Sequence, residues 1–366
     1  MPEANNLREA ERLMTICNSC RYCEGLCAVF PAMERRRLFA AGDLTYLANL
    51  CHACGACYDN CQFTPPHEFA VNVPRALSNL RRESWERYAW PAPFAVLFRR
   101  NFTAVATVLA LCIAGFLIGL TATHPAAMLL SADGLPGAFY RLMPHAAMAL
   151  LFGGATLFAL LALAMGVRHF WQSVNLADPL NVDAAALLQA VKDTGSLRYL
   201  GGGGAGCYNE SEQPGDTRRL FHHLTFYGFL LCFAATLVAT LYHYLLGREA
   251  PYAWYDLPVL LGTTGGAGLI IGPAGLAIAR HRRRGELQDA GQSGMDSAFI
   301  LMLLLTSLTG LALLLLRATP AMGVVLALHL GVVFTLLVTM PYSRFMHGIY
   351  RFAALLRYAL ERRNFR

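Results

Sequence analysis

Eight of the 11 cysteines in this chain of 366 residues fall in two matching stretches, CNSCRYCEGLC at residues 17–27 and CHACGACYDNC at residues 51–61. In each stretch three cysteines are separated by two residues, and a fourth follows after three more. Three thiolates at this spacing wrap one [4Fe–4S] cluster, while the fourth cysteine reaches the other cluster of a pair. The spacing therefore predicts two clusters with crossed ligands.

The crossed pattern assigns four cysteines to each cluster. The first cluster is predicted to be held by Cys17, Cys20, Cys23 and Cys61, and the second by Cys51, Cys54, Cys57 and Cys27. Ala28 and Gln62 follow the fourth cysteines, where the usual motif has proline. Because that proline shapes a turn and supplies no ligand, the assignment stands. Zinc sites more often pair two C-x2-C units than use such triplets.

The residues between the two stretches favour a helix. Leu44, Leu47 and Leu50 recur at roughly helical spacing, and no β-hairpin signal appears. We therefore expect residues 1–94 to form an α-helical ferredoxin-like domain. No secretory signal peptide is visible at the start, which favours a cytoplasmic location where cysteines stay reduced.

The rest of the chain has the composition of a membrane domain. Hydrophobic residues make up 56% of the sequence and charged residues only 14%, against about 25% charged in soluble proteins. A spanning helix needs about 20 apolar residues. Six stretches meet this length, at residues 101–122, 142–166, 221–246, 257–279, 297–316 and 322–343. We expect residues 95–366 to form an all-α, six-helix bundle like that of a cytochrome b, with a loop over residues 167–220.

The positions of the arginines predict how the chain is oriented in the membrane. The net charge is +7, and Lys192 is the only lysine. Arginines such as Arg99, Arg168 and Arg280 gather at alternate ends of the apolar stretches, which predicts that both termini face the cytoplasm. Because the basic residues flank apolar stretches, they indicate membrane topology and not nucleic-acid binding.

Histidines fall in two layers of this bundle. The inner layer contains His169, His222, His223 and His347, and the outer layer contains His124, His145, His243 and His329. A b-type haem between helices needs two histidines from different helices at one depth. His222 and His243 lie about 31 Å apart along one helix, so they cannot share a haem. Outer candidates are His145, His243 and His329. Inner candidates are His222 or His223 with His347 or His169. The alternative is that these histidines are hydrated and bind no metal.

Two glycine-rich stretches have simpler interpretations. Residues 201–207 read GGGGAGC but lack the Lys-Ser/Thr that follows in a phosphate-binding loop, so we expect a turn with Cys207 as a structural or free thiol. The stretch at 257–279 contains six glycines, which indicates close helix packing or room for a flat cofactor.

Several segments together resemble the tricarballylate utilisation protein B family, also called citrate utilisation protein B. These are the two cysteine stretches, GGGAGC at 202–207, FHHLTFYGF at 221–229, LYHY at 241–244, TSLTG at 306–310, HLG at 329–331, MPY at 340–342 and HGIYR at 347–351. The resemblance covers nearly the whole chain.

The resemblance implies a protein of the bacterial inner membrane that serves a FAD-dependent dehydrogenase oxidising tricarballylate to cis-aconitate. It implies that electrons pass through iron–sulfur clusters and one or two b-type haems to the quinone pool. It favours five histidines as haem ligands over His124, His145 and His169, namely His222, His223, His243, His329 and His347. A different flavoprotein could use the same pattern.

No catalytic constellation of the chain's own is visible in the sequence, so we expect an electron-transfer subunit. One alternative is a cluster and cytochrome b subunit like those of heterodisulfide reductases, which would pass electrons from quinol to a soluble reductase. A more distant alternative is a membrane transporter or sensor with a redox-sensitive cluster domain. The sequence does not indicate the direction of electron flow.

Overall fold

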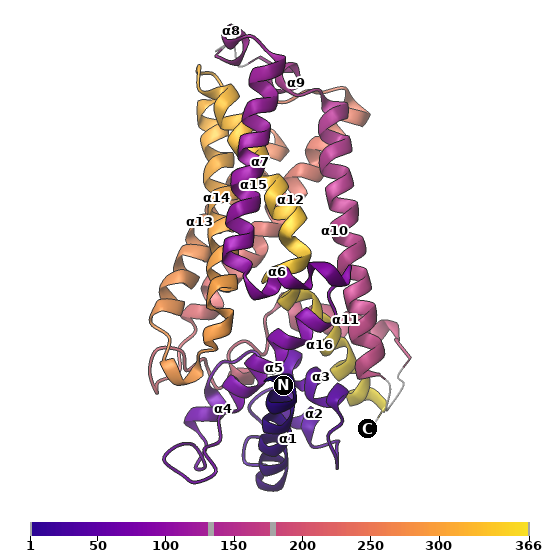
Figure 1. The fold of residues 1–366 in the computed structure, drawn as a ribbon, viewed down its shortest axis with the longest axis vertical. Coiled ribbons are helices and arrows are strands. Elements are labelled where there is room, and N and C mark those ends of the chain that lie inside the picture. The colour runs from indigo at the N-terminus through magenta and orange to yellow at the C-terminus, as the bar shows by residue number, and fades with distance from the viewer. Residues whose placement is uncertain (1, 131–134, 176–180, 365–366) are drawn as a thin grey trace.

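The computed structural model describes residues 2–130, 135–175 and 181–364. Figure 1 shows a long bundle of helices with a smaller group of helices below one end. Within the described residues there is no strand, and one isolated bridge joins Cys207 to Gly215. The expected all-α architecture is confirmed.

The smaller group is the N-terminal region that carries the two cysteine stretches. Its helices are α1 (Pro2–Cys20), α2 (Val29–Met33), α3 (Ala41–Leu50), α4 (Ala56–Asp59) and α5 (Val73–Arg87). Helix α5 begins where the Asn72 side chain accepts a hydrogen bond from the backbone N–H of Arg75 at 3.1 Å, which caps its first turn. Leu13, Tyr46 and Trp85 are fully buried between these helices and form the core. The helix expected between the cysteine stretches is α3.

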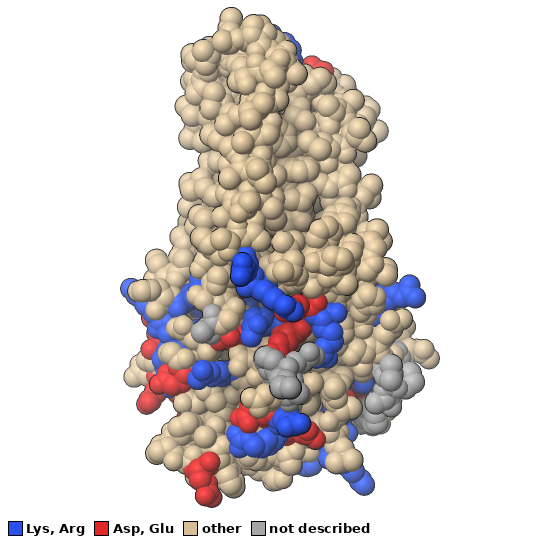
Figure 2. All heavy atoms as spheres, viewed as in Figure 1, with Lys and Arg blue, Asp and Glu red and all other residues tan. Residues whose placement is uncertain are grey.

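Six helices are long and apolar enough to cross a membrane. They are α7 (Asn101–Thr123), α10 (His145–Val174), α12 (Thr217–Leu246), α13 (Leu257–His281), α14 (Ser293–Leu316) and α15 (Met322–Thr339, extended by a 3₁₀ turn to Tyr342). All six expected stretches are confirmed as such helices. In Figure 2 the charged side chains on the visible face gather almost entirely over the lower part of the molecule. The bare upper part is the surface that a bilayer would cover.

Helices α12 and α13 approach each other through glycines. A Cβ on Gly265 would lie 2.8 Å from the carbonyl oxygen of Gly228, and one on Gly272 would lie 2.5 Å from Oγ1 of Thr225. Without side chains at these positions the two backbones pack directly, which is the usual way for helices to associate in lipid. Of the two interpretations of this stretch, the structure therefore supports close packing.

The remaining helices are short or lie at the ends of the bundle. They are α6 (Val96–Arg99), α8 (Ala126–Leu129), α9 (Ala138–Leu142), α11 (Ala184–Gly195) and α16 (Met346–Asn364). Helix α10 runs to Val174, so the segment expected to start at residue 167 begins eight residues later. Helix α11 begins at Asp183, whose carboxylate accepts a hydrogen bond from the N–H of Ala186 at 2.8 Å.

Helix α16 was not expected from the sequence. It packs against α3, α10 and α11 and so joins the bundle to the cysteine region. Its Glu361 is 1% exposed and accepts hydrogen bonds from Arg36 at 2.6 Å, Arg357 at 3.0 Å and the hydroxyl of Tyr46 at 3.1 Å. This buried network ties the end of the chain to α3.

Candidate metal centres and histidine pairs

The eight cysteines surround two cavities. The first, of about 220 Å³, is lined by Cys17, Cys20, Cys23, Cys57 and Cys61. The second, of about 20 Å³, is lined by Cys27, Cys51, Cys54 and Cys57. Apart from Cys57, which lines both cavities, the two groups of cysteines are those that the crossed pattern assigns to two clusters.

The donor set suits clusters of several irons better than single ions. Within the described residues, no group of three or more His, Cys, Asp or Glu side chains is placed to hold one metal ion. The thiols instead face cavities from several sides, as cluster ligands do.

The local folds around the cysteines explain how they meet. Cys17 and Cys20 lie in the last turn of α1, and Cys51 directly follows the end of α3. Gly55, with a φ of 87°, turns the chain into α4, which carries Cys57. A side chain rarely adopts that φ, so glycine allows the chain to curl round the second cavity.

Burial disfavours the charged thiolate form of these cysteines unless a cation binds them. Burial and neighbouring thiolates raise the pKa of Cys17 to about 12 and that of Cys23 to about 11. Burial is also the main reason why the pKa of Cys54 rises to about 11. Thiols are therefore protonated at neutral pH, and metal binding must displace their protons.

The two cavities differ in their access to solvent. Cys20 at the first cavity is exposed, whereas Cys51 and Cys54 at the second are only 7% and 9% exposed. The first centre therefore lies where an external molecule can approach it. The second lies next to the membrane helices, because Arg218 at the start of α12 and Arg283 after the end of α13 bond the backbone of its lining.

The glycine-rich stretch from residue 201 covers the second cavity, which its sequence did not indicate. The N–H of Tyr208 donates to the carbonyl oxygen of Cys54 at 2.8 Å, and Cys207 is buried beside Cys54. Gly202 lines the cavity, and a Cβ on Gly203 would clash with the carbonyl of Leu26. This stretch is a close-fitting cover and not only a turn.

The inner histidines form one pair whose spacing suits a shared metal atom. The rings of His222 on α12 and His347 on α16 lie 5.9 Å apart between centroids, at 72° to each other. Two imidazoles that bind one metal from opposite sides, each at about 2.0–2.1 Å, would place their centroids roughly 6 Å apart. His222 and His347 would therefore be able to hold one metal atom, such as the iron of a haem, between them.

Hydrogen bonding also prepares His347 as a ligand. Its Nδ1 lies 2.5 Å from the carbonyl oxygen of Arg344, and because a carbonyl only accepts, Nδ1 carries the proton. Nε2 is then left with a free lone pair. Burial lowers the pKa of His347 well below its usual value and keeps the ring neutral.

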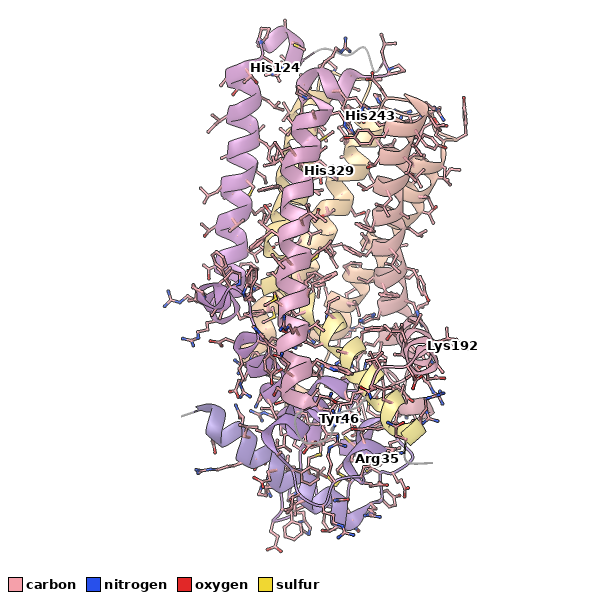
Figure 3. The ribbon with its side chains drawn as sticks, turned by 90° about the vertical axis from the view of Figure 1, so that its right-hand side faces the viewer. Arg35, Tyr46, His124, Lys192, His243 and His329 are labelled. Atoms are coloured by element: carbon pink, nitrogen blue, oxygen red, sulfur yellow. The ribbon has the colours of Figure 1, made fainter. Side chains whose placement is uncertain are left out.

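The outer histidines do not fit the same arrangement. The rings of His145 and His243 stack face to face with centroids 3.5 Å apart, which leaves no space for a metal between them. His329 lies alone on α15, where Oγ1 of Thr309 is 3.0 Å from its Nδ1. Figure 3 shows His243, His329 and His124 in the upper half of the bundle, far from Tyr46 of the cysteine region.

Two further inner candidates lie outside the inner pair. His223 stacks on Tyr227, with centroids 5.8 Å apart. His169 is partly buried on α10. In the described part of the chain, neither ring contacts another histidine. The structure therefore brings together His222 with His347 and His145 with His243, and leaves the other candidates separate.

His52 is a buried histidine that sequence reasoning did not select as a ligand. Both of its ring nitrogens are buried without a hydrogen-bond partner in the described residues. Burial and nearby arginines, with His222 close by, lower its pKa well below the usual value. It follows Cys51 directly and lines the second cavity, and His222 of the inner pair is close to it.

Comparison with known proteins agrees with these features. Residues 10–100 match the family described as the Fer4-like domain of citrate utilization protein B, and residues 98–366 match that described as citrate utilization protein B. Citrate utilization protein B of Escherichia coli is 49% identical over 369 residues, covering 99% of this chain and 93% of that protein. No solved structure matches the chain. The chain, with its eight cysteines in a Fer4-like domain and its six apolar helices, belongs to the citrate utilization protein B family.

Proposed function

We propose that this protein carries electrons from a reduced flavoprotein dehydrogenase, through two [4Fe–4S] clusters and haem b, to the quinone pool. The observation that carries the proposal is the order of the centres through the molecule. A group of partly exposed cysteines comes first, a more deeply buried group second, and a histidine pair at the base of the membrane helices third. Such a series suits single-electron transfer from a soluble donor into a membrane.

The cysteines have the task of holding the clusters. Four thiolates bind each cluster, and a bound cluster supplies reversible one-electron chemistry. Cys20 keeps the first centre open to the donor, and the stretch from Gly201 to Tyr208 keeps water from the second. Electrons are thereby guided towards the bundle and away from solvent.

His222 and His347 are the best supported haem ligands. They come from α12 and α16, so their spacing depends on the docking of α16. The stacked pair His145 and His243 would have to separate before it could hold a second haem. For His223, His329 and His169, no second histidine ring among the described residues is close enough to complete a pair.

The proposed setting is the bacterial inner membrane, with the cysteine region in the cytoplasm. Arginines such as Arg99 and Arg280 flank the helix ends next to that region, in agreement with the positive-inside rule. The relative from Escherichia coli is named for citrate utilization. The proposed donor is a FAD-dependent dehydrogenase acting on tricarballylate or a similar tricarboxylate.

The first test is a reduced-minus-oxidised optical spectrum of the full chain, purified anaerobically in detergent, with haem counted per chain. A sharp α-band of the b type and reduction of a water-soluble quinone by the prereduced protein would support the proposal. Bleaching of iron–sulfur absorption without a haem band would refute the haem part. Failure to reduce the quinone would refute the proposed acceptor.

A further inference from the structure

Two arginines, Arg81 buried and Arg351 partly buried, donate hydrogen bonds to the backbone at Cys51, which begins the second cysteine stretch. Nη1 of Arg81 on α5 donates to the carbonyl oxygen of Cys51 at 2.6 Å. Nη2 of Arg351 on α16 donates to the same oxygen at 2.7 Å. Two positive charges from separate elements therefore meet at one end of the second cavity.

Two more arginines hold the next carbonyls. Arg218 at the start of α12 donates to the carbonyl oxygen of His52 at 3.2 Å and to that of Ala53 at 3.3 Å. Arg283, after the end of α13, donates to the oxygen of Ala53 at 2.9 Å. We call Arg81, Arg218, Arg283 and Arg351 the arginine group. Its members come from both the cysteine region and the bundle.

Asp296 is the carboxylate whose charge acts on Arg81, Arg218 and Arg283, and one carboxylate does not balance the four positive charges of the arginine group. In the described parts of the chain, none of its four members forms an ion pair, and Asp296 instead pairs with Arg344 at 3.2 Å. Arg81 is only 2% exposed, and burial together with neighbouring arginines lowers its pKa to about 10. Buried positive charge of this kind is costly unless something negative lies beside it.

The first cavity has no such environment. Besides cysteines, its lining consists of apolar and uncharged polar side chains. They are Ile16, Tyr22, Phe30, Asn60, Gln62, Phe63, Val71 and Val73. The exposed Cys20 also brings this cavity close to water, which screens charge. Both linings therefore lack Arg, Lys, Asp and Glu side chains, and the centres differ in the four arginines that bond the backbone beside the second, against the exposed Arg21 that bonds Asn18 in the first stretch at 3.1 Å.

We propose that the arginine group raises the reduction potential of the second cluster above that of the first, and so draws electrons inward. The proposal rests on the proposed function, because it needs clusters at both cavities. A [4Fe–4S] cluster held by four thiolates is an anion that gains one further negative charge on reduction. Positive charges beside it in a low dielectric favour the reduced form.

The step itself is a transfer of one electron. The first cluster is oxidised from the 1+ to the 2+ core, and the second is reduced from 2+ to 1+. No bond and no proton changes place, and the electron comes from the reduced flavin of the donor. The positive charge at the second centre makes this direction favourable and makes return to the exposed first centre unfavourable.

The test is a redox titration of the full chain in detergent, monitored through the electron paramagnetic resonance signals of the reduced clusters. Cys20→Ser and Cys54→Ser identify the signals of the first and second cluster. In the wild type we expect the second cluster to be reduced first. Arg81→Gln and Arg283→Gln should each lower the equilibrium constant for its reduction about tenfold, which is about 59 mV for one electron. The first cluster should not change.

Arg75→Gln is the matched control. Arg75 is exposed on the same helix as Arg81, and its replacement by glutamine removes the same charge. Arg283→Lys keeps the charge and should keep the potential. If the glutamine variants lose their clusters, the proposal is tested by which cluster is reduced first in the wild type and in Arg283→Lys. Reduction of the first cluster before the second, or equal effects of Arg75→Gln and Arg283→Gln, would overturn the proposal. Ordered potentials without haem or quinone reduction would refute only the proposed function.

Discussion

The buried network at Glu361 predicts that one side chain secures the junction between the bundle and the cysteine region. Glu361 lies near the end of α16 with 2% of its side chain exposed, and Arg36 is 9% exposed. Replacing Glu361 with alanine leaves Arg36 and Arg357 buried without their shared carboxylate. Arg36 keeps Asp43 at 2.6 Å, whereas Arg357 loses its ion pair with Glu361 at 3.0 Å.

Breaking a buried pair by removing one partner costs about 3–5 kcal/mol, because a buried charge is left uncompensated. Since about 1.4 kcal/mol is a factor of ten, α16 should open roughly a hundred to a few thousand times more often. The matched control is Glu9→Ala, which removes an ion pair with Arg12 whose two side chains are each 43% exposed. Such a surface pair contributes about 0–1 kcal/mol.

Hydrogen exchange of the purified protein, resolved by segment, measures this opening directly. In Glu361→Ala we expect protection to fall by about two to three orders of magnitude in α16, while α7 keeps its protection. In Glu9→Ala protection in α16 should stay within tenfold of the wild type. If α16 exchanges at the same rate in both variants, the network does not hold the junction and the reasoning is wrong.

Three other variants follow from the packing. Gly203→Ala should speed the bleaching of iron–sulfur absorption in air several-fold, because the new Cβ would push the covering stretch away from the second cavity. Gly204→Ala is the control, because Gly204 also has a positive φ but a Cβ there would enter open space. Gly265→Ala should lower the stability of the fold by about 1–3 kcal/mol, because the new Cβ separates α12 from α13, and this loss would be measured as a lower Tm in detergent. Gly262→Ala should leave the Tm nearly unchanged, because its Cβ meets only ordinary contacts. His347→Ala should abolish one b-type haem per chain, and an unchanged haem content would contradict the inner pair.

The sequence was most informative where the pattern is local. The spacing of Cys17, Cys20 and Cys23 requires one short loop round one centre, and the distant Cys61 lines the same cavity. The membrane helices were equally clear, because a bilayer demands long uninterrupted apolar stretches. Both features depend on neighbouring residues and a general rule, not on the details of tertiary packing.

The features that were missed depend on contacts between distant segments. Helix α16 has no apolar stretch of spanning length, and its role follows from burial of Glu361 against Arg36, 325 residues away. The sequence of the glycine-rich stretch predicts a turn, because nothing local shows that Tyr208 meets Cys54. The histidine layers were expected, but only the structure distinguishes the 5.9 Å spacing of the inner pair from the stacked outer pair.

Electrons can follow this route only if eight cysteines hold two four-iron clusters. The most direct measurement is the content of iron and acid-labile sulfide in the full chain, purified without oxygen. The account predicts about eight iron atoms and about eight sulfides per chain, falling to about four of each in Cys54→Ser. Zinc in place of iron, or about four iron atoms in the wild type, would contradict it.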